Sequence, residues 1–142
     1  MKIKVSDINR EGLALKESFP ISRWDIDSDA VKFVDCTHIE GAFLRSEDVI
    51  IVNANITFNR KIKCARCLDE VCQEVKQDIT LTYSGKGSED YLEIDDDLRQ
   101  EVLLEYPMKA VCNPECLGIC SGCGVNLNHQ KCSCDIKTKK KR

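Results

Sequence analysis

The cysteines of the C-terminal segment have the residue type and spacing of a metal site. Six of the ten cysteines of the chain lie between Cys112 and Cys134. One Cys-x-x-Cys turn, Cys120-Ser-Gly-Cys123, is followed at once by a glycine, and a second close pair, Cys132-Ser-Cys134, comes shortly after it. Thiolates bind zinc tightly when four of them converge, and a Cys-x-x-Cys turn presents two sulfurs to one ion. A segment this short buries no core of its own, so a metal would have to hold it together.

The sequence therefore predicts a zinc knuckle in this segment. The ligands that the spacing favours are Cys120, Cys123, Cys132 and Cys134. Cys116 and Cys112 are the substitutes, and the sequence leaves open which four bind and whether there is one ion or two. His129 is a weaker candidate, since a lone histidine in a polar loop is more often solvated.

Two other uses of clustered cysteines fit less well. A disulfide scaffold needs an oxidising compartment, and the opening residues Met-Lys-Ile-Lys-Val-Ser-Asp contain no apolar run that could act as a secretion signal. We therefore expect a cytoplasmic protein with reduced thiols. The spacing also differs from the cysteine run of bacterial ferredoxins, which argues against an iron–sulfur cluster.

A second Cys-x-x-Cys, formed by Cys64 and Cys67, lies in mid-chain. It could share a metal ion with two leftover cysteines of the tail, act as a redox pair beside Arg66, or have a purely structural role. Redox catalysts normally place this motif at the start of a helix in an α/β unit, and no such unit surrounds it. The redox interpretation is therefore the least favoured of the three.

The residues on either side of this pair predict a β-hairpin. Apolar residues occupy alternate positions in two stretches: Ile50, Val52, Ala54, Ile56 and Phe58 in the first, and Val75, Ile79, Leu81 and Tyr83 in the second. Alternation with this period is typical of half-buried strands, and two such strands joined by a short segment pair by default. We expect a hairpin over about residues 49–83 with Cys64 and Cys67 at its tip.

Other elements are expected around this hairpin. Residues 2–8 predict a short strand, residues 11–30 predict loop and irregular structure with Trp24 in the core, and residues 31–44 predict one strand or a bent pair broken at Gly41. Within that last run, Cys36 is interpreted as a small buried hydrophobe. A helix over about residues 95–106 should begin with Asp97 as its cap and pack on the sheet.

Together these patterns predict an α+β fold. It would consist of a mostly antiparallel β-sheet or a partly closed barrel, with a packed helix and a C-terminal zinc knuckle. We expect a β-rich domain over residues 1–110, a cysteine-rich zinc-binding segment over residues 111–135 and a basic tail over residues 136–142.

Charge and composition limit the partners of the chain. The net charge of -3 argues against a protein that coats nucleic acid by charge alone, so any RNA binding would be local. The basic residues that could supply it are Arg60, Lys61, Lys63 and Arg66 in mid-chain and the tail residues 137–142, which include Lys139, Lys140 and Lys141. No apolar stretch is long enough to cross a bilayer, so we expect no membrane partner.

The sequence also offers no catalytic constellation. It has no nucleophile beside a base, no glycine-rich phosphate loop and no paired carboxylate site. We therefore expect a binding protein with no small-molecule substrate, rather than an enzyme.

Three stretches of the chain resemble the YceD family, bacterial proteins also described as large ribosomal RNA subunit accumulation proteins. They are Cys64-Ala-Arg-Cys67-Leu68, Tyr106-Pro-Met-Lys-Ala-Val-Cys112, and Cys116-Leu-Gly-Ile-Cys120-Ser-Gly-Cys123-Gly-Val-Asn-Leu-Asn128 followed by Cys132-Ser-Cys134. The resemblance implies a non-enzymatic role in large-subunit biogenesis. The chain would support 23S ribosomal RNA accumulation by binding that RNA, its precursor or a large-subunit ribosomal protein.

The resemblance also directs attention to the hairpin tip. The chain is similar to the cysteine-rich branch of the family found in firmicutes and their relatives, while the other branch keeps mainly the Cys-x-Arg-Cys motif. The implied common function thus involves Cys64, Arg66 and Cys67. Arg66 is the leading candidate for an RNA contact, since a guanidinium suits a phosphate or a guanine edge, and pairing with Asp69 or Glu70 is the alternative.

One further function class stays open. The chain could be a thiol- or zinc-responsive regulatory binding protein, whose cysteines release metal upon oxidation and so change the partner that it holds.

Overall fold

The computed structural model describes residues 1–85 and 90–134 of the chain. The chain divides into two compact units. The first unit consists of Met1–Lys61 and Cys72–Tyr106, and the second of Ile62–Val71 and Pro107–Arg142. Each is described here by itself.

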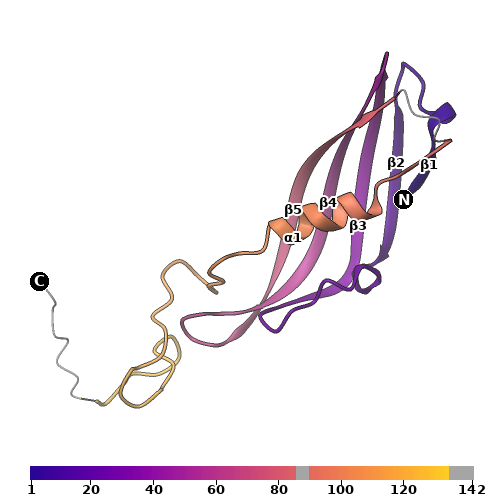
Figure 1. The fold of residues 1–142 in the computed structure, drawn as a ribbon. Coiled ribbons are helices and arrows are strands. Elements are labelled where there is room, and N and C mark those ends of the chain that lie inside the picture. Colours follow the sequence, from indigo (N-terminus) through magenta and orange to yellow (C-terminus); the bar gives the residue numbers. More distant parts are fainter. Residues whose placement is uncertain (86–89, 135–142) are drawn as a thin grey trace, which may run out of the picture. The chain divides into compact units, whose positions relative to one another are not determined.

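The first unit is built on a four-stranded sheet (Figure 1). Its strands are β2 (Leu13–Pro20), β3 (Val31–Ser46), β4 (Val49–Lys63) and β5 (Glu70–Ser84), arranged in the order β2-β3-β4-β5. The last two residues of β4 and the first two of β5 belong to the second unit. The prediction of a mostly antiparallel sheet in an α+β fold is confirmed. The partly closed barrel is wrong, because β2 and β5 end the sheet as open edges within the described residues.

The predicted hairpin strands are present. Every second residue of β4 from Ile50 to Phe58 is buried, as the alternation requires: Ile50, Val52, Ala54, Ile56 and Phe58. The helix α1 (Asp95–Leu104) lies across the sheet in Figure 1 and buries Leu98 and Val102 completely. The side-chain amide of Gln77 on β5 donates to the carbonyl of Glu101 at 3.1 Å, which ties the helix to the edge strand.

A second, two-stranded sheet completes the first unit. The short strand β1 (Lys2–Lys4) pairs antiparallel with β6 (Tyr91–Glu93). The predicted strand over residues 2–8 is therefore shorter than expected, since Val5–Asp7 continue as the 3-10 turn η1.

The expectation of irregular structure over residues 11–30 is wrong for its central part. Strand β2 pairs along its length with β3, and the 3-10 turn η2 (Ile21–Trp24) follows it. Charged side chains obscure the alternation of Leu13, Leu15 and Phe19 in this stretch, as is usual on an edge strand. Trp24 is buried, which confirms its place in the core.

Strand β3 runs unbroken through Gly41, so the bent pair broken at this glycine is wrong. A Cβ at Gly41 would lie 3.0 Å from the ring of Phe43, so the glycine makes room for that ring instead of breaking the strand. Cys36 is exposed, contrary to expectation. The residues of β3 that point into the core have odd numbers, such as Phe33 and Ile39, so Cys36 faces outward.

The helix begins earlier than its predicted cap. Ile94 is the N-cap residue and forms no side-chain capping bond, while Asp97 lies within the first turn. The carboxylate of Asp97 instead accepts a hydrogen bond of 2.5 Å from the hydroxyl of Tyr83 on β5. The carboxylate of Asp97 thus makes a tertiary hydrogen bond instead of the predicted capping bond to the helix backbone. No helix in the described part of the chain is both long enough and apolar enough to span a membrane.

Candidate metal centres

Eight cysteines of the second unit gather into two groups of four. We call Cys64, Cys67, Cys112 and Cys116 the tip cluster, and Cys120, Cys123, Cys132 and Cys134 the tail cluster. Within each cluster all four sulfurs lie within 4.8 Å of one another. Each cluster could therefore hold one metal ion.

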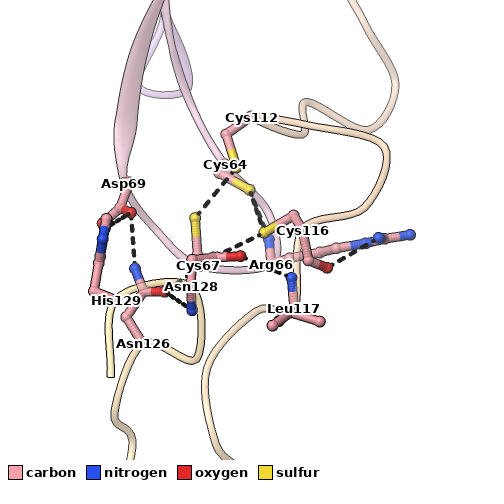
Figure 2. A network of polar contacts seen from close by, with 10 residues as sticks. All are labelled: Cys64, Arg66, Cys67, Asp69, Cys112, Cys116, Leu117, Asn126, Asn128 and His129. Carbon is pink, nitrogen blue, oxygen red and sulfur yellow. Dashed lines mark hydrogen bonds and ion pairs between the residues drawn. The ribbon is translucent and has the colours of Figure 1, made fainter. Parts of the chain in front are cut away.

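The tip cluster joins the hairpin tip to the C-terminal segment (Figure 2). The sulfurs of Cys64 and Cys116 are 3.8 Å apart, and those of Cys67 and Cys112 are 3.6 Å apart. Tetrahedral zinc with Zn–S bonds of about 2.3 Å places its sulfurs about 3.8 Å apart, so these sulfurs are already spaced for the ion. Three of the four cysteines are buried, and Cys112 is half-buried.

The tail cluster contains the four cysteines that the sequence favoured as ligands. The sulfur of Cys132 lies 3.2 Å from that of Cys120 and 3.5 Å from that of Cys123. Cys120 is buried, whereas Cys123 and Cys134 are exposed. The two clusters therefore differ in their access to solvent.

The first Cys-x-x-Cys turn is organised around its leading sulfur. The backbone N–H of Arg66 donates to the sulfur of Cys64 at 3.4 Å, and the N–H of Leu68 donates to the carbonyl of Cys64 at 2.9 Å. Leu68 takes a left-handed conformation with φ of 65°, which is unfavourable for a leucine. Such strain persists only where the surroundings impose it, here through the turn that aims two sulfurs at one point.

The second Cys-x-x-Cys turn repeats this design. The N–H of Gly122 donates to the sulfur of Cys120 at 3.4 Å, and the N–H of Gly124 donates to its carbonyl at 2.9 Å. Gly124 has φ of 72° and takes the same left-handed conformation as Leu68. A glycine adopts this conformation without the strain that it imposes on a leucine.

Within each cluster, hydrogen bonds and burial give the thiols different pKa values. Backbone N–H donors, that of Cys67 first, lower the pKa of Cys64 to about 6. Although the N–H of Asp69 acts in the opposite direction, burial and the neighbouring thiols raise the pKa of Cys67 to about 12. In the tail cluster, backbone donors lower the pKa of Cys120 to about 6, while Cys123 and Cys132 raise that of Cys134 to about 12. Four thiolates this close repel one another, and a bound divalent cation would compensate that repulsion.

The guanidinium of Arg66 is used inside the second unit. Its Nη1 donates to the carbonyl of Pro114 at 3.1 Å and to that of Cys116 at 3.3 Å. It thereby holds the loop that carries Cys112 and Cys116 of the tip cluster. Within the described residues Arg66 has no carboxylate partner, since Asp69 binds other groups.

Four side chains support the tip cluster: Asp69, Asn126, Asn128 and His129 (Figure 2). Sequence analysis considered His129 only as a weaker metal ligand and Asp69 only as a partner of Arg66, and it did not select the two asparagines. Among the described residues, His129 belongs to neither cluster. The carboxylate of Asp69 accepts from the amide of Asn126 at 2.7 Å and lies 2.9 Å from Nε2 of His129. These two contacts, His129 first, lower the pKa of Asp69. The side-chain amide of Asn128 donates to the sulfur of Cys116 at 3.3 Å. The repeated asparagines before His129 were the available signal, since asparagine often makes local side-chain hydrogen bonds in loops.

The remaining candidate residues are basic. Lys63 is exposed at the end of β4. Lys139, Lys140 and Lys141 lie outside the described residues.

Replacement of Arg66 by alanine should loosen the tip cluster. The variant loses two hydrogen bonds from a charged donor, which we expect to cost about 1 kcal/mol, less than buried bonds of this kind because the side chain is exposed. Metal release from the tip cluster to a chelator should then be about fivefold faster, which a colorimetric chelator would follow. Lys63→Ala is the control, and equal release rates for the two variants would contradict this structural role of Arg66.

Comparison with known proteins shows which family the C-terminal part of the chain resembles. Residues 85–142 match the model of the family described as "Large ribosomal RNA subunit accumulation protein YceD". This C-terminal segment is similar to the YceD family. The segment contains the whole tail cluster and Cys112 and Cys116 of the tip cluster. It does not include the hairpin tip with Cys64 and Cys67.

Similar proteins include two plant members of the YceD family, each named "Large ribosomal RNA subunit accumulation protein YCED homolog 1, chloroplastic". The one from Zea mays is 35% identical over 69 residues, which are 48% of this chain and 23% of that protein. The one from Arabidopsis thaliana is 40% identical over 50 residues, which are 35% of this chain and 16% of that protein.

A bacterial relative matches over a longer stretch. An uncharacterized protein of Mycobacterium tuberculosis is 31% identical over 102 residues, covering 59% of this chain and 49% of that protein. This chain thus spans about half of the mycobacterial relative and less than a quarter of the plant relatives. No solved structure matches the chain significantly.

Proposed function

We propose that the chain is a non-enzymatic factor that supports accumulation of 23S ribosomal RNA during biogenesis of the large ribosomal subunit. It would act in the cytoplasm by binding that RNA, its precursor or a large-subunit ribosomal protein. The observation that carries this proposal is the match of residues 85–142 to the YceD family, since the names of the family and of its plant relatives refer to large ribosomal RNA subunit accumulation. The matched segment is also the part of the chain that carries most of the clustered cysteines.

We also infer that both clusters bind zinc. Each offers four sulfurs and no other donor, and a set of four cysteine thiolates is typical of structural zinc sites. Such a site leaves no coordination position open for water or substrate. The chemistry of the donors thus supports a role in holding the second unit together and agrees with a protein that is not an enzyme.

The zinc content of the purified chain tests this inference. We expect two zinc ions per chain, one for each cluster, when metal and protein are quantified together. The double variant Cys132→Ser/Cys134→Ser should retain one ion. The matched control is Cys36→Ser/Cys72→Ser, which removes two exposed thiols outside both clusters and should retain both ions. Equal zinc content in all three proteins would count against the assignment.

Direct RNA binding is the first of the two modes of action to test. Lys63, Arg66 and the tail lysines Lys139, Lys140 and Lys141 are the residues we propose for phosphate contacts. Because Arg66 also holds the loop at Cys116, its replacement changes structure and RNA binding together. Alanine variants of Lys63 and the tail lysines are therefore the cleaner probes.

Ultraviolet crosslinking of the chain to RNA in living cells is the decisive experiment. Enrichment of a discrete site in 23S ribosomal RNA or its precursor, weakened by the lysine variants, would support direct binding. Recovery of background RNA alone would contradict direct binding and leave a ribosomal protein as the proposed partner. Unchanged 23S ribosomal RNA levels in cells lacking the chain would overturn the proposed function itself.

A second candidate function rests on the exposure of the tail cluster. Cys123 and Cys134 are both exposed, so oxidants can reach thiolates that would bind metal. A thiol- or zinc-responsive regulator should lose zinc and change its partner at mild peroxide levels. An assembly factor with purely structural zinc should keep its partner under the same conditions.

A further inference from the structure

The loop formed by residues 124–131 connects two cysteines of the tail cluster. It follows Cys123 directly and leads into Cys132, so both of its neighbours in the chain are members of that cluster. Near its start, the N–H of Cys120 donates to the carbonyl of Val125 at 2.8 Å. We call this loop the bridging loop. Its two ends are held close together when the four cysteines of the tail cluster converge.

The middle of the bridging loop contacts the tip cluster. Asn126 and His129 both bind the carboxylate of Asp69, two residues after Cys67 on the hairpin tip. The N–H of Leu127 donates to the carbonyl of Gly118, two residues after Cys116, at 2.9 Å. The loop is therefore fastened to both of the chain segments that supply ligands to the tip cluster.

Asn128 makes the most direct of these contacts. Its side-chain N–H donates to the sulfur of Cys116, and its side-chain oxygen accepts from the N–H of Leu117 at 2.9 Å. The side chain is itself oriented by Asn126, whose oxygen accepts from Nδ2 of Asn128 at 2.9 Å. The bridging loop thus places a hydrogen-bond donor on a candidate ligand of the other cluster.

These contacts have an energetic consequence for metal binding. A donor to a ligand sulfur orients that sulfur and stabilises the negative charge that it carries when it binds metal. The donor is in place only if the bridging loop is ordered, and ordering a loop costs conformational entropy. Closing the tail cluster around a metal would supply that order.

We propose that the bridging loop couples the two clusters, so that metal in the tail cluster strengthens metal binding in the tip cluster, with Asn128 as the positioning residue. This proposal rests on the proposed metal binding of both clusters. Loss of groups that orient metal ligands typically weakens affinity about 10–100-fold. We expect the coupling to lie near the lower end of this range, about 10-fold, because one hydrogen bond to one of four ligands is involved. Coupling between two sites is reciprocal, so metal in the tip cluster should strengthen the tail cluster by the same factor.

The test measures the zinc affinity of the tip cluster by competition with a chelator, using the full chain. Emptying the tail cluster with Cys132→Ser/Cys134→Ser should weaken zinc binding at the tip cluster about 10-fold. Emptying the tip cluster with Cys112→Ser/Cys116→Ser should weaken the tail cluster equally. Agreement between the two factors would support the proposal, and unchanged affinities in both directions would overturn it.

Asn128→Asp tests the positioning role, because it keeps the accepting oxygen and replaces the N–H donor to Cys116 with a negatively charged oxygen. Its tip cluster should bind zinc more weakly while both clusters still fill. With cadmium-113 as the probe metal, the resonance of the tip cluster should shift and that of the tail cluster should stay in place. Gln130→Ala is the control within the same loop and should change neither.

The outcomes separate this proposal from the metal binding on which it rests. Two filled clusters with unchanged affinity and unchanged cadmium resonances in Asn128→Asp would overturn the coupling through Asn128 while leaving metal binding intact. Absence of zinc from both clusters of the unaltered chain would overturn both proposals.

Discussion

Removal of metal with a strong chelator is expected to unfold residues 107–134 while the four-stranded sheet stays folded. The buried cluster around the hairpin tip consists of Cys64, Cys67 and Cys116, with Val111 and Cys112 packed against it. Structural zinc contributes about 10–16 kcal/mol of apparent binding free energy in zinc-finger peptides, far more than a core of this size could supply. Without metal, the second unit should therefore lose its order.

Amide hydrogen exchange would check this result. Exchange at Cys116 and Leu127, whose amides are hydrogen-bonded within the second unit, should become fast after chelation, and that of the buried residues of β4 should stay slow. Restoring zinc should restore protection. Slow exchange at both amides in verified metal-free protein would contradict a structural role for the metal.

The substitution Phe58→Ala should strongly destabilise the first unit. Phe58 is 2% exposed, and its ring centroid lies 5.4 Å from that of Phe33 on the neighbouring strand β3. Truncation of a buried phenylalanine typically costs about 3–5 kcal/mol, because it removes apolar contacts and leaves a cavity. A domain of ordinary stability has about 5–15 kcal/mol in total, so much of the stability of the sheet would be lost.

Urea unfolding of the variant, followed through the tryptophan fluorescence of Trp24 in the first unit, would measure this loss. Lys61→Ala is the control, since this residue lies on the same strand and is exposed. Its unfolding midpoint should remain close to that of the unaltered chain. A loss below about 1 kcal/mol for Phe58→Ala would mean that the site tolerates the cavity and that the core is less closely packed than described.

The elements that sequence analysis recovered are those in which local pattern and tertiary burial agree. The alternation around Ile56 predicts a strand because each inward residue is apolar and each outward residue is polar. In the edge strand β2, charged residues such as Lys16 and Glu17 interrupt a weaker apolar pattern, and the strand was missed. Its pairing with β3 is a non-local contact that local propensity does not contain.

The start of the helix shows the same limit. Asp97 and Gln100 have the spacing of a capping box, yet the helix begins at Asp95. The hydroxyl of Tyr83 on β5 donates a hydrogen bond to the carboxylate of Asp97. Local capping preferences amount to about 1 kcal/mol, which a tertiary hydrogen bond and helix packing can outweigh.

The sequence by itself determined which cysteines of the tail could meet. Cys120 and Cys123 share one turn, and the short loop that follows returns the chain to Cys132 and Cys134, so covalent connectivity alone keeps these four close. The structure brings this set together. Short-range spacing is sufficient here because no partner from elsewhere in the chain is needed.

Only the tertiary structure decided where Cys112 and Cys116 belong. The same spacing separates Cys112 from Cys116 and Cys116 from Cys120, so spacing alone does not assign Cys116 to one cluster or the other. The structure pairs them with Cys64 and Cys67 from the hairpin tip. It also brings Asn128 to the sulfur of Cys116 and Arg66 to the carbonyls beside it. These contacts join segments far apart in the chain, and their formation depends on the folded path of the backbone, which residue spacing does not encode.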